Sequence, residues 1–154
     1  MSSVITETIE ILKEKSPIPL QDIYIDDLVI GIFFTGVKLS TSHGGVAFTP
    51  IGEIPEAVCC PTTAARMPQA GNLEGNPVSE ILKYAMDPNV LKSAIGVATL
   101  NALSQFFIES EDGREYETIK EKDGFDLLEI KPDETVTLIG AFGPYIRRLK
   151  MMGI

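Results

Sequence analysis

The sequence predicts an α+β fold, in which an antiparallel β meander packs against helices and the first β-α unit of an α/β domain follows. Three observations predict it. Residues 22–50 contain short apolar runs separated by turn residues, residues 88–107 form one long apolar helical segment, and the apolar run at 135–139 precedes a glycine loop and a helical pattern.

The first element is an amphipathic helix over residues 3–15. Ile5, Ile9 and Leu12 fall on one helical face. Ser16-Pro17 ends the helix, because the residue before a proline disfavours helical backbone. We expect this helix to pack on the core.

The meander occupies residues 22–50. Val37 and Leu39, and then Val46 and Phe48, alternate with polar or small residues. The sequence Ser42-His43-Gly44-Gly45 is typical of a tight turn, and its paired glycines are expected to supply the positive φ angles. Residues 51–77 are then predicted to form a long loop, a length that usually serves a site or a lid.

After a short helix at 78–86, residues 88–107 give the strongest helical signal. Asp87 is predicted as the N-cap and Pro88 as the first helical residue. A helix that is apolar nearly all round is buried. Ala94, Ala98 and Ala102 recur every four residues, so another element can approach this helix closely.

Residues 109–122 are charged, and we place a domain boundary near residue 122, giving domains 1–122 and 123–154. Residues 135–139 are predicted as a strand that is covered on both faces. Pro144 then opens a short helix, which ends at Gly153.

Composition excludes several classes of partner. Thirteen basic and 22 acidic residues give a net charge of −9. The compact basic group Arg147, Arg148 and Lys150 lies at a predicted helix end, where bases complement the helix dipole. We therefore expect no nucleic-acid or membrane partner. No apolar run reaches the ~20 residues of a membrane span, and the N-terminus lacks a secretory pattern, so a cytoplasmic protein is predicted.

Three stretches together resemble a known family. They are Gly31-Ile-Phe-Phe-Thr-Gly-Val-Lys followed by Gly44-Gly-Val-Ala-Phe-Thr-Pro; Ala94-Ile-Gly-Val-Ala-Thr-Leu-Asn-Ala-Leu; and Asp126-Leu-Leu-Glu-Ile-Lys-Pro-Asp-Glu-Thr-Val-Thr-Leu-Ile-Gly-Ala-Phe-Gly-Pro. The chain is similar to the prokaryotic two-domain proteins of unknown function that are named for heavy-metal chelation.

The resemblance implies an N-terminal domain similar to that of enolase and a Rossmann-like C-terminal domain. In such proteins the second domain should continue for roughly another 100 residues. The chain is therefore expected to carry only the start of that domain.

The family name directs attention to soft-metal ligands. Cys59 and Cys60 are thiols of the kind that bind such metals. Adjacent side chains of an extended segment point in opposite directions, and two small buried apolar residues are the alternative interpretation. His43, the single histidine, is the third candidate, with an exposed turn residue as its alternative.

Two groups of residues are candidates for ligand binding. One is the glycine loop with Gly140, Phe142 and Gly143, which follows a predicted strand as anion-binding loops do; a tight turn is its alternative. In the other, Asn101 interrupts a predicted buried face, and a structural hydrogen bond to a neighbouring loop is its alternative. Thr35 is a polar side chain at a flexible strand site between Phe34 and Gly36, with an ordinary sheet residue as its alternative. Gly44 and Gly45 complete this second set.

These observations lead to three functional hypotheses. The first is a binding protein for a metal ion or for a small metal-containing or anionic ligand, held in a cleft between the domains. The second is an enzyme that acts on a small anionic metabolite. The third is a non-catalytic assembly module, a possible homo-oligomer, in which the strand at 135–139 pairs with another chain.

Overall fold

The computed structural model describes residues 4–53, 69, 71–110, 117 and 119–154. Its chain divides into two compact units, Met1–Tyr116 and Glu117–Ile154, called unit 1 and unit 2 below. Each unit is described by itself. The predicted domain boundary near residue 122 stays a prediction.

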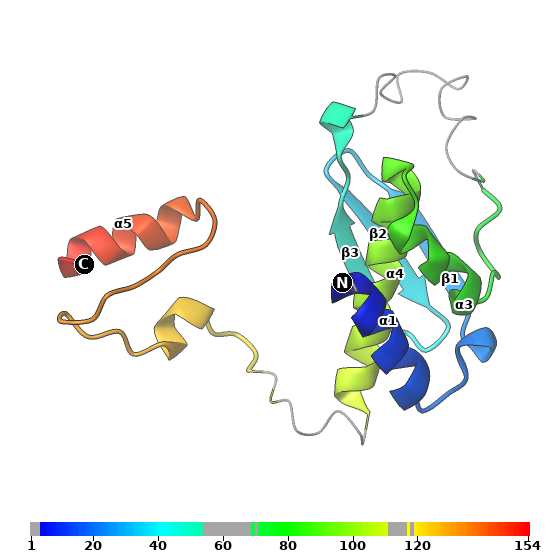
Figure 1. The fold of residues 1–154 in the computed structure, drawn as a ribbon, viewed down its shortest axis with the longest axis horizontal. Helices are drawn as coiled ribbons and strands as arrows, with labels where there is room; N and C mark the ends of the chain where they lie inside the picture. Colours follow the sequence, from blue (N-terminus) through cyan, green and yellow to red (C-terminus); the bar gives the residue numbers. More distant parts are fainter. Residues whose placement is uncertain (1–3, 54–68, 70, 111–116, 118) are drawn as a thin grey trace. The chain divides into compact units, whose positions relative to one another are not determined.

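Unit 1 contains the predicted meander as a three-stranded antiparallel sheet in the order β1-β2-β3 (Figure 1). The strands are β1 (Ile25–Ile30), β2 (Phe34–Leu39) and β3 (Gly44–Phe48). The register shifts between Ile25 and Asp27. The α+β class expected from the sequence is therefore confirmed for this unit.

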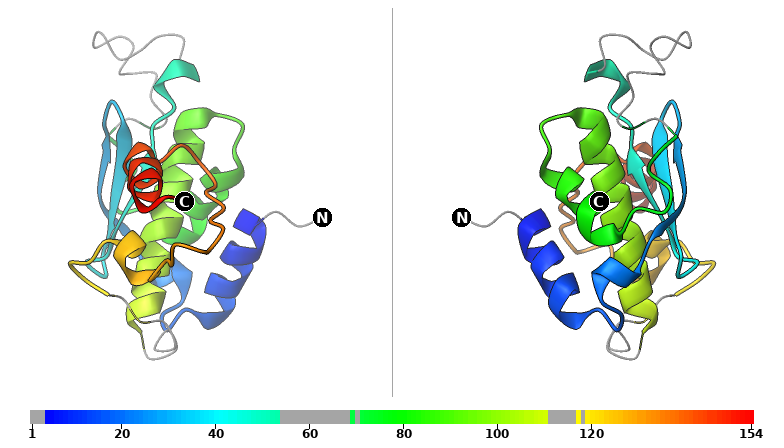
Figure 2. Two further views of the ribbon diagram at one scale, coloured as in Figure 1. Left: turned by 90° about the vertical axis from the view of Figure 1, so that its left-hand side faces the viewer. Right: turned by 90° about the vertical axis from the view of Figure 1, so that its right-hand side faces the viewer.

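Helices cover one face of the sheet (Figure 2). The long helix α4 (Val90–Glu109) packs against β2 and β3, and α1 (Val4–Lys15) packs against α4. The predicted helix at 78–86 is α3 (Val78–Ile81) continued by the 3-10 helix η3 (Leu82–Met86). Two further 3-10 turns, η1 (Leu20–Asp22) and η2 (Ile51–Glu53), lie on the connections.

The N-cap of α4 differs from the prediction. Asn89 caps the helix, because its side-chain oxygen accepts from the N–H groups of Leu91 and Lys92, each at 3.1 Å. Asp87 instead accepts from the Asn89 N–H at 2.8 Å and forms the turn before the cap. Pro88 thus precedes the helix.

The prediction for the paired glycines is also wrong. Gly44 and Gly45 begin β3, and the positive φ of the hairpin falls on Ser42, at 68°. Gly45 is required for a different reason. A Cβ placed there would lie 2.2 Å from the carbonyl oxygen of Ala98 and 2.3 Å from the backbone nitrogen of Ala102. The alanine ridge predicted on this helix therefore meets the backbone of β3.

The core of unit 1 lies between the sheet and the helices. Helix α4 supplies its centre, including Ile95, Ala98 and Leu103, each 0% exposed. In length and composition α4 could cross a membrane, contrary to the expectation from the sequence. However, 56% of its most apolar stretch is buried inside the protein. The core helix of a soluble protein meets the same criterion, and α4 has that role here.

Unit 2 contains the 3-10 helix η4 (Gly124–Leu127) and the helix α5 (Gly143–Met152). Gly153 ends α5 in the left-handed conformation, as predicted, with φ of 80°. The strand predicted at 135–139 is wrong. Residues 135–139 have no strand assignment, and Ile139 is 90% exposed. A strand needs a hydrogen-bonded neighbour, and the described residues of this unit supply none.

Candidate functional site

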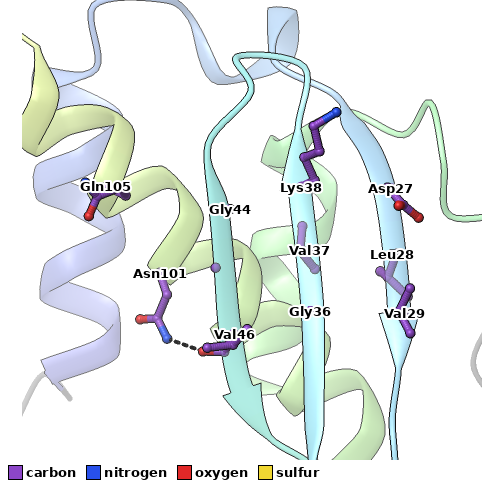
Figure 3. A pocket seen from close by; sticks show the side chains of 11 residues that line it. Asp27, Leu28, Val29, Gly36, Val37, Lys38, Gly44, Val46, Asn101 and Gln105 are labelled. Carbon is purple, nitrogen blue, oxygen red and sulfur yellow. Dashed lines mark hydrogen bonds between the residues drawn. The ribbon is translucent and has the colours of Figure 1, made fainter.

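A shallow groove of about 540 Å³ lies over the three strands and reaches α4 (Figure 3). It brings together three of the predicted ligand-binding residues, Gly44, Gly45 and Asn101. Its other lining residues are Asp27, Leu28, Val29, Gly36, Val37, Lys38, Val46 and Gln105. Gly36 lacks a side chain and pairs with Val29 and Val46, which leaves the sheet surface hollow between these valines.

Three polar side chains of the groove, Lys38, Asn101 and Gln105, are engaged within the protein. Lys38 binds the Asp26 carboxylate, and this hydrogen bond raises the pKa of Lys38. The Gln105 amide donates to Glu109 at 2.6 Å. A ligand in this groove would therefore contact mainly apolar surface.

Asn101 lies at the edge of the sheet. Its side-chain nitrogen donates to the Val46 carbonyl oxygen at 2.8 Å, so it ties α4 to β3. The sequence predicted a buried amide that holds a neighbouring segment. The hydrogen bond is present, but the residue is exposed and its partner is a strand rather than a loop.

Thr35 does not line the groove. Its side chain points into the core, where it is 0% exposed and shares a 2.9 Å hydrogen bond with the buried Thr49 hydroxyl. The pairing lets two hydroxyl groups be buried without a lost hydrogen bond. Thr35 is thus a residue of β2 that faces the core, in line with its alternative interpretation as an ordinary sheet residue.

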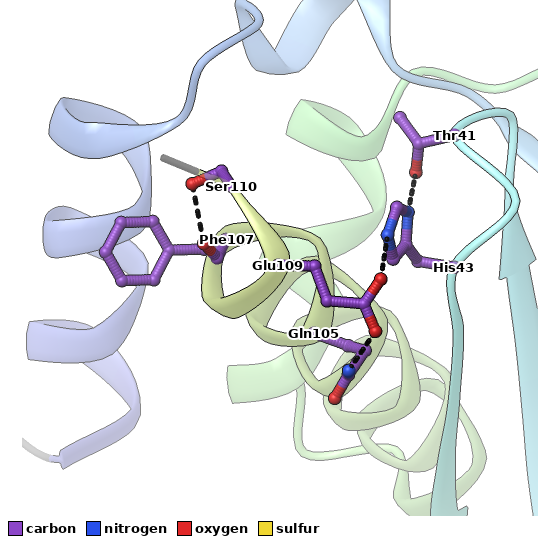
Figure 4. A network of polar contacts seen from close by, with 6 residues as sticks. All are labelled: Thr41, His43, Gln105, Phe107, Glu109 and Ser110. Atoms are coloured by element: carbon purple, nitrogen blue, oxygen red, sulfur yellow. Dashed lines mark hydrogen bonds and ion pairs between the residues drawn. The ribbon is translucent and has the colours of Figure 1, made fainter. Parts of the chain in front are cut away.

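His43 belongs to a polar cluster that joins the β2–β3 hairpin to the end of α4 (Figure 4). Its Nε2 atom lies 3.2 Å from the Glu109 carboxylate, and its Nδ1 atom lies 3.0 Å from the Thr41 hydroxyl. The His43 ring also packs on Phe106, with ring centroids 5.1 Å apart. Only 18% of the His43 side chain is exposed, so it is not a free turn residue.

Glu109 is the member of this cluster that sequence reasoning missed. It is the last residue of α4 and meets His43 across 66 positions of the sequence. Gln105, one helical turn earlier, donates to the other carboxylate oxygen. The available signal was a polar pair four residues apart at the end of an apolar helix, but nothing in the sequence indicates its partner.

The thiol candidates Cys59 and Cys60 lie outside the described residues. Within the described ranges, no three His, Cys, Asp or Glu side chains gather in a way that could hold a metal ion. His43 and Glu109 are therefore a two-residue donor pair.

In unit 2, the predicted loop residues precede α5. Gly140 has φ of 104°, Phe142 stacks on Tyr145 with centroids 5.8 Å apart, and the Gly143 N–H donates to the Ala141 carbonyl at 3.1 Å. The loop therefore uses a glycine N–H internally. Because the strand before it is absent, this loop does not sit at the end of a sheet strand.

Polar contacts beside this loop fasten α5 to η4. The Tyr145 hydroxyl donates to Asp123 at 2.7 Å, and Arg148 binds Asp126. The Tyr145 hydrogen bond, with the Phe125 N–H, lowers the pKa of Asp123. The same hydrogen bond raises the pKa of Tyr145. Arg148, predicted to complement the helix dipole, thus forms specific ion pairs.

The fold and the cluster define unit 1 as a small α+β domain with a helix-backed meander. A family model described as "Putative heavy-metal chelation" (DUF4213) matches residues 10–104. The chain belongs to this family, whose function is unknown. No curated protein matches the chain.

Among the solved structures, the chain is similar to a protein of unknown function from the DUF364 family of Desulfitobacterium hafniense, with 21% sequence identity and a TM-score of 0.50. The match covers 79% of this chain and 44% of that protein, so this chain spans less than half of its length. At this identity the match supports the fold alone.

Proposed function

We propose that the chain binds a divalent transition-metal ion through His43 and Glu109. One observation carries this proposal: the Nε2 and carboxylate oxygen atoms lie 3.2 Å apart and face each other. When a metal ion lies about 2.0–2.2 Å from each of two donor atoms, the donor atoms themselves are separated by about the distance seen between Nε2 and the carboxylate oxygen. A small adjustment of either side chain would open the position for the ion.

The neighbouring residues support both donors in the way that outer-shell residues do in metal sites. Thr41 lies within hydrogen-bonding distance of the distal ring nitrogen of His43, and Gln105 donates to the distal oxygen of Glu109. Such contacts orient the donor atoms and fix the imidazole tautomer. Phe106 packs against the ring and limits its rotation.

Metal binding at this pair would compete with a proton. Without metal, the Nε2 atom faces a carboxylate and is best satisfied when it carries a hydrogen. A metal ion requires the Nε2 lone pair, so the hydrogen must move to Nδ1, which faces the Thr41 hydroxyl, or leave the ring. Because metal ligands bind in their deprotonated form, the affinity strengthens as pH rises. With two donors from the described residues, water completes the coordination, and the site is weaker than a closed four-ligand site.

The description of the family supports this proposal, since it names heavy-metal chelation. Cys59 and Cys60 stay predicted soft-metal ligands, and a cytoplasmic location stays a prediction. The other predicted classes, a bound anionic ligand and an enzyme for a small anionic metabolite, also remain predictions, to be tested by a ligand and turnover screen.

The test is calorimetric titration with Zn²⁺ and Ni²⁺ at pH 6 and pH 8, together with elemental analysis of the purified protein. His43→Gln and Glu109→Gln are each expected to weaken binding at least tenfold. The matched control Glu80→Gln removes a surface ion pair with Lys83 and should leave binding unchanged.

The double variant Cys59→Ser/Cys60→Ser separates the two predicted donor sets. If it abolishes binding while His43→Gln does not, the thiols are the ligands and the proposed pair is wrong. Equal affinity in the wild type and in both pair variants would also reject the proposal. Circular dichroism of each variant checks that the fold is intact.

A further inference from the structure

The outer face of the sheet carries a continuous apolar surface. Its four large side chains are Val29, Phe34, Val46 and Phe48, with exposed fractions between 60% and 63%. Ile32 and Phe33 on the neighbouring turn are similarly exposed. Contiguous apolar patches on a protein surface mark sites of interaction, so this face is a candidate interaction surface.

The strand register arranges this face in three rows. Asp27, Lys38 and Gly44 pair across the strands in the first row. The middle row is Val29, Gly36 and Val46. The third row contains the pair Phe34 and Phe48. Large rings thus occupy one end of the strands, and a glycine and a lysine occupy the other.

We propose that a second copy of this chain covers the face. The two sheets then pack about a two-fold axis that lies between them and runs across the strands. This axis reverses the strand direction and places the third row of one copy on the first row of the other. Phe48 then lies over the partner's Gly44, where a side chain is missing. Phe34 lies over the partner's Lys38, and the valine rows meet at the centre.

Shape and charge both favour this arrangement. Aligned sheets pack about 10 Å apart with interdigitated side chains, so a ring needs a hollow opposite it, and Gly44 supplies one. A lysine over a phenylalanine ring makes a favourable cation–π contact. The alternative axis, parallel to the strands and along β2, would instead place Lys38 on the partner's Lys38 and Phe34 on the partner's Phe34. The contact is isologous, as closed dimers require.

The proposed arrangement can be tested by exchanging the ring of Phe48 with the hollow at Gly44. The Cβ of Gly44→Phe has room in the monomer, because it meets only the Val37 carbonyl oxygen, at 3.8 Å, and Gly44 is exposed. Gly44→Phe and Phe48→Gly should each weaken the dimer at least tenfold. The double variant Gly44→Phe/Phe48→Gly places each new ring over the partner's new hollow and should restore association.

The measurement is sedimentation equilibrium of the full chain over 1–200 µM. The control Ile11→Ser removes an apolar side chain of α1 that is 49% exposed and lies away from this face, and it should not alter the dimer. Circular dichroism reports whether each variant is folded. The metal-binding residues are not in the three rows, so the two proposals can fail separately.

Three results would overturn the proposal. They are a wild type that stays monomeric at all concentrations, a dimer that survives both single variants, and a folded double variant that does not reassociate. If the wild type stays monomeric but binds an apolar peptide or dye on this face, the proposal is also overturned, and the face belongs to a different partner.

Discussion

Each of the two units of this chain is stabilised internally by a different kind of interaction. Unit 1 buries a continuous cluster of aliphatic side chains between α4 and the sheet. Among its described residues, unit 2 buries only the large apolar side chains of Phe125 and Leu149 and fastens α5 with surface hydrogen bonds and ion pairs. Surface ion pairs contribute little to stability. Unit 1 is therefore the stable scaffold, and unit 2 has a local arrangement that is easily disturbed.

The largest expected effect is in unit 1, at the contact between β3 and α4. Gly45→Ala adds one methyl group that meets backbone atoms of Ala98 and Ala102 at 2.2 and 2.3 Å. Backbone cannot rotate away, so strand and helix must separate. We expect a loss of about 3 kcal/mol or more in the free energy of unfolding, measured by urea titration followed by circular dichroism.

The control for this change is the adjacent residue. Gly44→Ala makes the same chemical change in the same strand, but its added carbon meets only the Val37 carbonyl oxygen, at 3.8 Å. Its free energy of unfolding should stay within about 0.5 kcal/mol of wild type. Equal losses in both variants would show that strand propensity, rather than the close approach, decides the effect.

The next effect compares the two units directly. Leu103→Ala opens a cavity at a fully buried position of α4, and such changes cost about 2–5 kcal/mol. Leu149→Ala, in α5, should leave the urea midpoint of unit 1 unchanged, because the described part of unit 2 has no comparable core. The measurement is urea unfolding followed by methyl NMR signals from each unit. A shift of the unit 1 midpoint in Leu149→Ala would show that the units unfold together.

The same difference explains what the sequence could predict. Period-two alternation in β2 and β3 and the apolar α4 are strong signals that burial enforces, so the meander, its neighbouring helices and the alanine ridge were predictable. The strand at 135–139 was predicted from a short apolar run and from the glycine loop that follows it. Such a local pattern does not reveal whether a neighbouring strand exists, and the described residues of unit 2 provide none.

The candidate site was only partly predictable, because it depends on contacts that are distant in sequence. His43 was found as a lone histidine, whereas its partner Glu109 enters only through the packing of α4 against the hairpin. Asn101 was recognised as an unusual polar residue, but its partner Val46 was not. The paired glycines were assigned to turn geometry, since a sequence does not distinguish positive φ from close approach.

The smallest effect is the pH response of unit 2. The pKa of Asp123 lies below its ordinary value of 3.8, chiefly because Tyr145 donates to it. The unfolded chain therefore binds a proton first as pH falls, and the contribution of this contact is present above about pH 4 and is lost as pH falls through the lower, folded pKa. The pKa of Tyr145 is raised above 10.0 by the same bond. Its contribution is present below pH 10 and is lost as pH rises through the folded value.

An NMR titration can follow the Phe125 amide, which donates to the same Asp123 carboxylate. In Tyr145→Phe we expect the midpoint of its acid titration to move up toward the ordinary carboxyl value, because the largest cause of the shift is removed. Signals of the Thr35–Thr49 pair in unit 1 should not move over this range, since no titratable group takes part in that bond. An unchanged Phe125 midpoint in the variant would mean that the backbone N–H and Arg148 hold Asp123 without the tyrosine. The polar contacts of unit 2 would then be less dependent on one another than the comparison with unit 1 implies.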